Sequence, residues 1–205
     1  MTDYDWSPDG KKLVLEVLDD PPPGSDAADE DKTPAPIVID RYYFKEDETG
    51  YLDSRRQHLY LLDVASGKTE VLTDGRFGER YPTWSPDGTR IAFLSKRAPD
   101  PDRDNMWGLY VMSAQPAAAA RLVTAFVGDS NTRSSVSAPE WSPNGRDIAF
   151  IAGTDHKLLY YAQTKLNVVA AAGWRSARRE PGAGSQRDPA SMVGRRKVDL
   201  RAGRG

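Results

Sequence analysis

Short apolar runs that alternate with polar turns predict a chain built mainly from β-strands. The segments His58–Val64 and Thr69–Thr73 are both rich in β-formers and are separated by a short turn that contains Gly67. Such a pair predicts an antiparallel hairpin, because glycine supplies the positive φ that tight turns need. Two further runs, Ile91–Leu94 and Ile148–Ile151, are continuously apolar, which predicts strands that are buried on both faces.

A ten-residue pattern occurs three times in the same phase. Each copy reads Trp-Ser-Pro, then Asp or Asn, then Gly, two polar residues and an apolar strand, and the tryptophans are Trp6, Trp84 and Trp141. The motif predicts a β-turn after a strand that ends in Trp, because proline presets φ and glycine tolerates positive φ. Further strands are expected at Gly108–Met112 and Lys157–Tyr161. Repeated four-stranded units of about 40–45 residues are typical of β-propeller blades.

The repeats are unevenly spaced along the chain. The first interval contains an acidic, proline-rich stretch at residues 19–36, which is expected to be a solvated insertion, and a strand or irregular hairpin at Ile37–Lys45. Residues 6–84 form either one blade with an insertion, which is the preferred interpretation, or two blades.

The predicted fold class is all-β: a partial, open β-propeller of about two to three four-stranded blades. A closed propeller needs at least about four blades, so the end blades would leave apolar faces uncovered. We therefore expect either a piece of a larger propeller or a subunit that completes itself by association through its open blade faces.

The C-terminal residues differ sharply in composition. Residues 173–205 carry nine Lys or Arg and three acidic residues, although the whole chain has a net charge of −2. The predicted organisation is a partial propeller over residues 1–166 and a low-complexity basic tail over residues 167–205, either disordered or translated out of frame. A basic tail could neutralise phosphates, but this one has no aromatic residue after Trp174, so nucleic acid is not expected as a partner.

Composition excludes several classes of protein. The absence of cysteine excludes a disulfide scaffold, a thiolate zinc site and a cysteine nucleophile. No apolar run reaches about 18 residues, so neither a membrane-spanning helix nor a membrane partner is expected. The polar N-terminal residues do not form a signal peptide, which predicts a cytoplasmic location.

Residues 36–112 resemble the N-terminal propeller of the prolyl oligopeptidase family, in its acylaminoacyl-peptidase and dipeptidyl-peptidase-like branch. The resembling segments are Pro36–Arg41 with Phe44 and Lys45, Gly50–Arg56, His58–Gly67 and Leu72–Gly75, together with the three Trp-Ser-Pro motifs that TolB-like propellers share. The resemblance extends over about residues 1–166. Members of this family are serine peptidases in which the propeller covers an α/β-hydrolase domain with a Ser-Asp-His triad. The resemblance implies a substrate-gating role for this part and a peptide as the substrate of the intact protein.

The chain departs from that family in the residues that would perform catalysis. It has no Gly-x-Ser-x-Gly nucleophile elbow: Gly128–Thr132 lacks the second glycine, and Gly184-Ser185 has no strand–turn–helix context. Its two histidines are His58, interpreted as a solvated strand end, and His156, interpreted as a turn residue. No catalytic residue is assigned and no catalysis is expected from this chain, although the resemblance is to enzymes. The alternative hypothesis is a TolB-like propeller that binds a protein or peptide.

Three other motifs favour structural roles. Ala65–Thr69 has the end of a phosphate-binding loop but lacks its earlier glycine. Asp100–Asn105 alternates carboxylates as a calcium loop does, but lacks the loop's glycine and its final glutamate. The three repeat tryptophans are expected to pack between blades and not to stack on a ligand. No cofactor-binding or metal-binding residue is therefore predicted, and no cofactor is expected.

Overall fold

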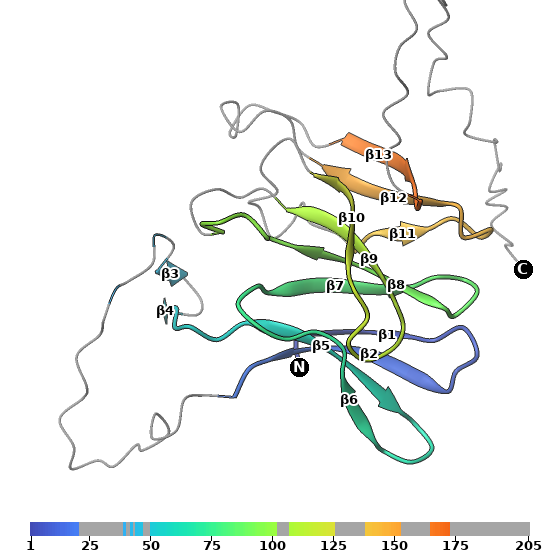
Figure 1. Cartoon of the computed structure of the whole chain (residues 1–205), viewed down its shortest axis with the longest axis horizontal. Helices are drawn as coiled ribbons and strands as arrows, with labels where there is room; N and C mark the ends of the chain where they lie inside the picture. The colour runs from blue at the N-terminus through green and yellow to red at the C-terminus, as the bar shows by residue number, and fades with distance from the viewer. Residues whose placement is uncertain are drawn as a thin grey trace, which may run out of the picture. The chain divides into compact units, whose positions relative to one another are not determined.

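A computed structural model describes residues 1–20, 39, 42, 44–46, 50–101, 107–125, 138–152 and 165–172. All of them belong to a unit formed by residues 1–174, and residues 175–205 form a second unit (Figure 1). The described residues form strands and turns, and no helix occurs among them.

Three antiparallel sheets of three or four strands form most of the described part of the first unit, which confirms the all-β, open-propeller prediction. Sheet 1 has the order β1-β2-β5-β6, sheet 2 has the order β10-β9-β8-β7, and sheet 3 has the order β11-β12-β13. The strands are β1 (Asp3–Trp6), β2 (Lys12–Leu18), β5 (Gln57–Asp63), β6 (Thr69–Val71), β7 (Glu79–Trp84), β8 (Arg90–Ser95), β9 (Gly108–Ser113), β10 (Arg121–Ala125), β11 (Glu140–Trp141), β12 (Asp147–Ala152) and β13 (Lys165–Ala170). A separate hairpin joins β3 (Lys45–Glu46) to β4 (Gly50–Tyr51).

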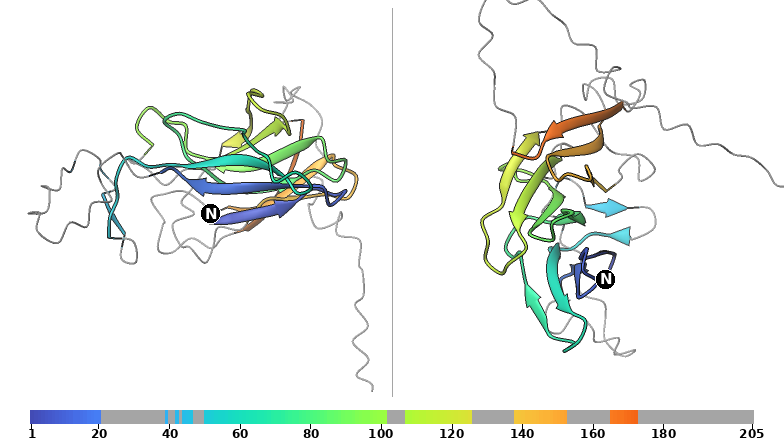
Figure 2. Two further views of the ribbon diagram at one scale, coloured as in Figure 1. Left: turned by 90° about the horizontal axis from the view of Figure 1, so that it is seen from below. Right: turned by 90° about the vertical axis from the view of Figure 1, so that its right-hand side faces the viewer.

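The sheets follow one another in chain order, as Figure 2 shows. Strand β1 contacts β7, and β7 contacts β11, so the strands that end in the repeat tryptophans are neighbours. Residues 6–84 contribute one complete sheet, because β2 pairs directly with β5 across the long interval between them. Two hydrogen bonds join the ends of that interval. The backbone N–H of Asp19 donates to the backbone oxygen of Arg56, and the backbone N–H of Arg56 donates to Oδ2 of Asp19. One blade with an insertion is therefore the correct interpretation.

The three Trp-Ser-Pro turns have the same hydrogen bonds. In each turn the serine hydroxyl donates to the Asp or Asn side chain two residues later, at 2.6–2.8 Å. The serine oxygen also accepts the backbone N–H five residues later, at 2.8–2.9 Å. The turn glycines Gly10, Gly88 and Gly145 have φ of 69°, 67° and 65°, a region that L side chains rarely adopt. Local sequence therefore sets each turn as predicted.

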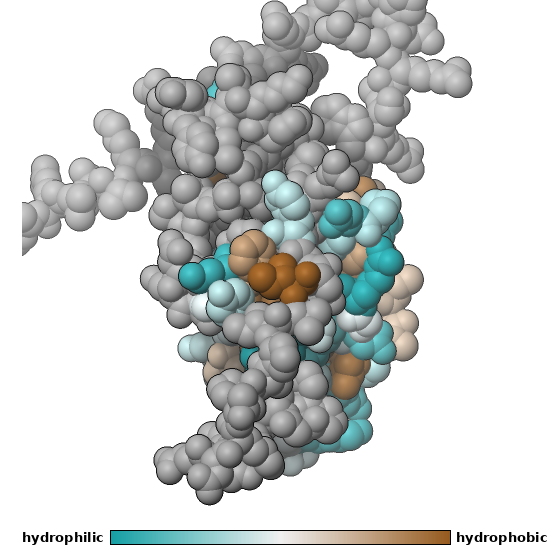
Figure 3. Space-filling view, turned by 90° about the vertical axis from the view of Figure 1, so that its left-hand side faces the viewer, coloured by the Kyte–Doolittle hydropathy of each residue, from teal (hydrophilic) through white to brown (hydrophobic). Residues whose placement is uncertain are grey.

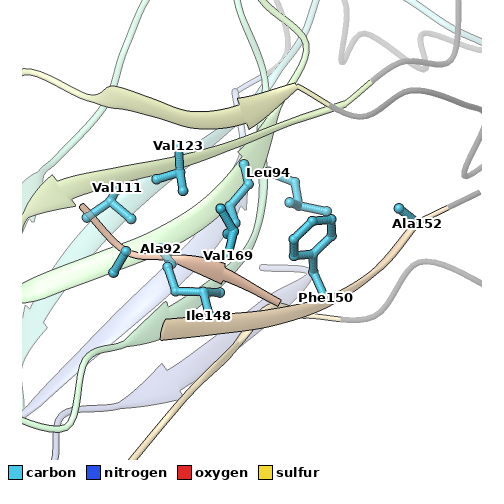
Figure 4. Close-up of a cluster of buried hydrophobic side chains, with 10 residues drawn as sticks. Ala92, Leu94, Val111, Val123, Ile148, Phe150, Ala152 and Val169 are labelled. Atoms are coloured by element: carbon cyan, nitrogen blue, oxygen red, sulfur yellow. The ribbon is translucent and has the colours of Figure 1, made fainter. Parts of the chain in front are cut away.

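Strand β8 is buried on both of its faces. Ile91 and Phe93 pack into a core shared with sheet 1, whereas Ala92 and Leu94 pack into a core shared with sheet 3. Figure 4 shows the second core, in which Ile148 and Phe150 of β12 lie near side chains from sheet 2. Two-sided burial explains the continuous apolar run in β8.

Strand β12 does not follow the prediction of two-sided burial. Its residues alternate, with Ile148, Phe150 and Ala152 buried and Ala149 and Ile151 only partly buried. The physical reason is that sheet 3 meets another described sheet on one face only. The apolar sequence of β12 is suited to two neighbouring sheets, and the described residues provide one.

Strand β13 occupies the third position of sheet 3. The strand expected there, Lys157–Tyr161, lies outside the described residues, and β12 pairs instead with Lys165–Ala170. This strand crosses the domain boundary that the sequence places after residue 166. Most of the insertion at 19–36 and the basic residues 173–205 also lie outside the described residues.

Candidate functional site: a buried polar seam between sheets 1 and 2

Three ionisable side chains are buried among the described residues, and all three belong to strands of sheets 1 and 2. Glu16 on β2 is 3% exposed, His58 on β5 is 5% exposed, and Glu79 on β7 is 1% exposed. Burial of charged groups is unfavourable unless they are paired and hydrogen-bonded. We call Glu16, His58, Glu79 and the groups that bind them, Thr73, Arg97 and Tyr81, the polar seam.

Glu79 is the centre of the polar seam. Its Oε2 atom lies 3.0 Å from His58 Nδ1 and accepts a hydrogen bond from Thr73 Oγ1 at 2.9 Å. Its Oε1 atom accepts a hydrogen bond from Arg97 Nη2 at 3.0 Å. Thr73 in turn accepts the backbone N–H of Leu59 at 2.9 Å. The carboxylate at the start of β7 therefore connects sheet 1 to the residues that follow β8.

His58 lies between two carboxylates. Nδ1 faces Glu79, and Nε2 lies 3.5 Å from Oδ1 of Asp19. The hydrogen bond to Glu79 is the main cause that raises the pKa of His58 above its ordinary value, and it outweighs the lowering effect of burial. Asp19 raises the pKa further. These contacts favour the imidazolium form, with Nδ1 hydrogen-bonded to Glu79 and Nε2 facing the Asp19 carboxylate.

The interpretation of His58 as a solvated strand end is wrong. His58 is the second residue of β5, where it pairs with Val17 of β2 and points into the interface between sheets 1 and 2. Its principal partner, Glu79, lies 21 residues away on the next sheet. The sequence signal for this pair is a histidine within the apolar strand β5 and a glutamate at the start of β7, the first strand of the next sheet.

Arg97 completes the charge balance around Glu79. Its guanidinium carbon lies 4.6 Å from the centroid of the Tyr110 ring and 5.7 Å from that of Phe93. Its Nε atom donates to Ser95 Oγ at 3.2 Å. The aromatic rings hold the cation in place by cation–π attraction, while its end binds Glu79.

Glu16 supports an unusual backbone conformation on β7. Its Oε2 atom accepts the backbone N–H of Tyr81 at 2.9 Å, and its Oε1 atom accepts the hydroxyl of Thr2 at 2.7 Å. Tyr81 has φ of 56°, and the β7–β8 register shifts between Arg80 and Thr83. Burial is the main cause that raises the pKa of Glu16. A side chain of sheet 1 thus stabilises a strained bulge of sheet 2.

The chemistry of the polar seam is that of a clamp between sheets. His58 and Glu79 are bound to each other across the two sheets. Both ring nitrogens of His58 face carboxylates, whereas a Ser-His-Asp triad needs a serine hydroxyl at one ring nitrogen. No group of three or more His, Cys, Asp or Glu side chains in the described part of the chain could hold a metal ion. Where Figure 3 colours the surface, hydrophilic residues surround a few small hydrophobic areas.

Of the other candidate motifs from the sequence, some form turns and others lie outside the described residues. Ala65–Thr69 forms the turn between β5 and β6, with Gly67 at φ 70°, as the hairpin prediction requires. Residues 102–105 of the Asp100–Asn105 loop lie outside the described residues, as do His156, Gly128–Thr132 and Gly184-Ser185. No helix in the described ranges is long and apolar enough to cross a membrane.

Two of the repeat tryptophans join neighbouring sheets, as predicted. The indole N–H of Trp84 donates to the backbone oxygen of Asp5, and that of Trp141 donates to the backbone oxygen of Thr83, both at 3.2 Å. Trp6 has no preceding sheet in the described structure and is 49% exposed.

Comparison with known proteins adds sequence relatives and a fold match. No protein-family model matches the chain. The uncharacterized peptidase YuxL of Bacillus subtilis is 31% identical over 106 residues, and dipeptidyl-peptidase 5 of Porphyromonas gingivalis is 25% identical over 153 residues. A structure of a putative TolB from Agrobacterium tumefaciens matches 84% of the chain with a TM-score of 0.50 at 18% identity. The chain is similar to peptidases in sequence and to a TolB-like propeller in fold.

These findings confirm the predicted resemblance at that level. The matches cover 52% and 73% of this chain but only 14% of YuxL and 17% of dipeptidyl-peptidase 5. The TolB-like match covers 46% of that protein. The chain therefore corresponds to a minor part of each peptidase.

Proposed function

We propose that this chain is part of the N-terminal propeller of a prolyl oligopeptidase-family serine peptidase, in which it limits the size of the peptides that reach a separate hydrolase domain. The observation that carries the proposal is the combination of sequence similarity to two peptidases with a fold of successive propeller sheets. Catalysis belongs to the hydrolase domain, because this sequence has no nucleophile elbow and His58 is bound by carboxylates.

The gating role is tested in a chimera. Residues 1–172 replace the matched segment of dipeptidyl-peptidase 5, and hydrolysis is measured on a chromogenic dipeptide substrate and on unfolded casein. We expect cleavage of the dipeptide and exclusion of casein. A folded chimera that digests both substrates contradicts the gating role.

The isolated chain provides the control. It should give no hydrolysis above the buffer blank on dipeptidyl or acyl-aminoacyl substrates. Turnover that persists through repurification and is blocked by a serine-directed reagent would show that the chain carries its own nucleophile.

A second candidate function is a TolB-like binding module for a protein or peptide. The observation behind it is the fold match to the putative TolB, of which the chain covers 46%. A binding module would show saturable affinity for members of a fluorescent peptide library when titrated as the isolated chain. A gate that acts only above a hydrolase domain would show none.

A further inference from the structure

Two cationic side chains of sheet 2 lie near one tryptophan ring. The guanidinium carbon of Arg80 lies 5.6 Å from the centroid of the Trp107 ring, and Nζ of Lys96 lies 5.2 Å from it. Arg80 belongs to β7, Lys96 follows β8 and Trp107 precedes β9, so three adjacent strands bring these residues to the same end of the sheet. We call these three side chains the cation cluster.

The cation cluster lies on the face of sheet 2 that points toward sheet 3. Arg80 pairs with Leu94, and the side chains of directly paired residues share one face of a sheet. Leu94 belongs to the core shared with sheet 3, and Trp107 packs against that core. The polar seam instead faces sheet 1, where Glu79 contacts His58. The cation cluster is therefore separate from the polar seam.

Arg80 differs from the other half-buried arginines of the described ranges. Each of the others donates a side-chain hydrogen bond to a protein oxygen, and they are Arg55, Arg56, Arg90 and Arg97. Within the described structure, the guanidinium of Arg80 has neither a hydrogen bond nor an ion pair. Glu16 attracts it electrostatically, but the oxygens of Glu16 accept the Tyr81 N–H and the Thr2 hydroxyl. Since a partly buried charge is favourable only when it is paired, Arg80 has the donors for an anion that the fold does not supply.

A strained bulge sets the direction of Arg80. The next residue, Tyr81, has φ of 56°, and the register of β7 with β8 shifts after Arg80. Glu16 holds this conformation by accepting the Tyr81 N–H at 2.9 Å. Bulges re-aim side chains, and backbone strain concentrates at sites that bind ligands. The strained backbone thus adjoins the arginine that lacks a protein partner.

The propeller repeat does not require cations at these positions. When sheets 1 and 2 are aligned by the register of their strands, the equivalent positions in sheet 1 hold Asp3, Leu18 and Gln57. An acidic, an apolar and an amide side chain thus replace the two cations and the indole in the same framework. The cation cluster is therefore a feature of sheet 2 and not of the blade.

We propose that Arg80, Lys96 and Trp107 bind the carboxylate of a peptide. The planar guanidinium fork of Arg80 matches the two oxygens of a carboxylate, and Lys96 adds a second positive charge beside the same ring. The Trp107 ring offers an apolar surface to the group that carries the carboxylate. Inorganic phosphate has no such group, so the ring favours a peptide. The inference concerns a ligand site of this chain and does not depend on the proposed peptidase relationship.

The test follows the indole N–H resonance of Trp107 in NMR spectra of the full-length chain. The chain has five tryptophans, and Trp107→Phe identifies the relevant resonance by its loss. Acetyl-Ala-Phe carries a C-terminal carboxylate, whereas acetyl-Glu-Phe-amide carries a side-chain carboxylate. We expect a saturable shift with at least one of them, and the tighter binder identifies the source of the carboxylate. Acetyl-Ala-Phe-amide, which has no carboxylate, should give no saturable shift, and inorganic phosphate should bind more weakly than the peptide.

Substitutions locate the binding energy. Arg80→Met removes the charge and keeps the length of the side chain, so Kd should rise about tenfold to a hundredfold, the range expected for hydrogen bonds between charged groups. Lys96→Met should raise Kd by a smaller factor, because a point charge makes no bidentate contact. Arg146→Met is the matched control, since it removes an arginine from an exposed turn of sheet 3 and should leave Kd unchanged.

A conservative variant covers the case in which the neutral variant does not fold. Arg80→Lys keeps the charge and loses the fork, so its Kd should lie between those of the wild type and Arg80→Met. Because Arg80 donates no hydrogen bond within the described structure, both variants should keep the wild-type urea midpoint, as a purely structural arginine would not. The proposal is overturned by equal shifts with the amide and the carboxylate peptides, by phosphate that binds as tightly as the peptide, or by wild-type affinity in Arg80→Met. Equal losses of affinity in Arg80→Met and Arg146→Met would also overturn it, since they indicate attraction by net charge alone.

Discussion

Individual side chains determine this structure in two ways, by local turns and by distant buried contacts. The Ser-Pro-Asp-Gly turns depend on neighbours in sequence, whereas Glu16 and Tyr81 are 65 residues apart. Both kinds of contact can be tested by substitutions that keep the shape of the side chain and change its charge or hydrogen bonding.

The turn carboxylate Asp87 provides the first prediction. Its hydrogen bonds with Ser85 and Thr89 lower its pKa to about 2. The stability that it contributes is therefore present above pH 3.8 and is lost as the pH falls toward 2. Asp87→Ala should lower the free energy of unfolding at pH 7 by about 1 kcal/mol, a modest value because the side chain is exposed.

The third turn supplies the matched control for this prediction. Asn144 occupies the position of Asp87 and accepts from Ser142 at 2.8 Å. Asp87→Asn should thus retain most of the stability at pH 7 and remove the acid-dependent loss between pH 4 and pH 2. Urea unfolding across that range measures both effects.

Glu16 provides the second prediction. Its pKa is raised in the folded state mainly by burial, so its contribution to stability is greatest at low pH and declines as the pH rises through that pKa. Glu16→Gln keeps an acceptor for the Tyr81 N–H and should match or exceed wild-type stability at pH 8. Glu16→Ala leaves that N–H without its acceptor and should cost about 1–3 kcal/mol. Equal urea midpoints for the two variants would refute the role of the hydrogen bond.

At the scale of strands and turns, the sequence predicts the features that depend on neighbouring residues. The turns, the β5–β6 hairpin and the two-sided burial of β8 follow from local pattern, because each depends on residues close in sequence. The third strand of sheet 3 could not be placed from the sequence. In Lys165–Ala170 only Val169 is buried, while Leu166 and Val168 lie on an uncovered face, so the apolar residues do not mark one buried face. His58 and Glu79 could not be paired either, because no local rule links a strand to a residue on the next sheet.

The central position of β8 provides the third prediction. Phe93 is fully buried between sheets 1 and 2 and stacks on Tyr110 with ring centroids 5.9 Å apart. Phe93→Ala should cost about 3–5 kcal/mol by urea unfolding. Phe150 of β12 is 8% exposed in a sheet with one described neighbour, so Phe150→Ala should cost less. The reverse order of costs would contradict the assignment of sheet 2 as the central sheet.

At the scale of the whole molecule, the polar seam makes the packing of sheet 1 on sheet 2, and with it the free energy of unfolding, depend on pH. The pKa of His58 is raised above 6.5 in the folded state, chiefly by Glu79. Its contribution to stability is fully present below pH 6.5 and is lost as the pH rises through the folded pKa. The free energy of unfolding should therefore fall as the pH rises from about 6.5 through the higher folded pKa.

A substitution tests the origin of this pH dependence. His58→Gln retains a polar side chain that can donate to Glu79 but does not titrate, so the variant's free energy of unfolding should not show the decline above about pH 6.5. Lys68→Gln is the control, since Lys68 pairs with Glu70 on the exposed hairpin and should leave the wild-type slope intact. Persistence of the slope in His58→Gln would assign it to another group.

The pairing of β2 with β5 has a consequence for the order of folding. Sheet 1 must bring together strands separated by residues 19–56, whereas β8 and β9 of sheet 2 are separated only by residues 96–107. The entropy of closing a loop rises by roughly 0.6 kcal/mol for each doubling of its length, so the longer connection carries an extra cost of about 1 kcal/mol before any contact forms. We therefore predict that sheet 2 forms before sheet 1, and that Ile91 and Phe93, which sheet 1 buries in the folded chain, provide the apolar surface on which β2 and β5 meet.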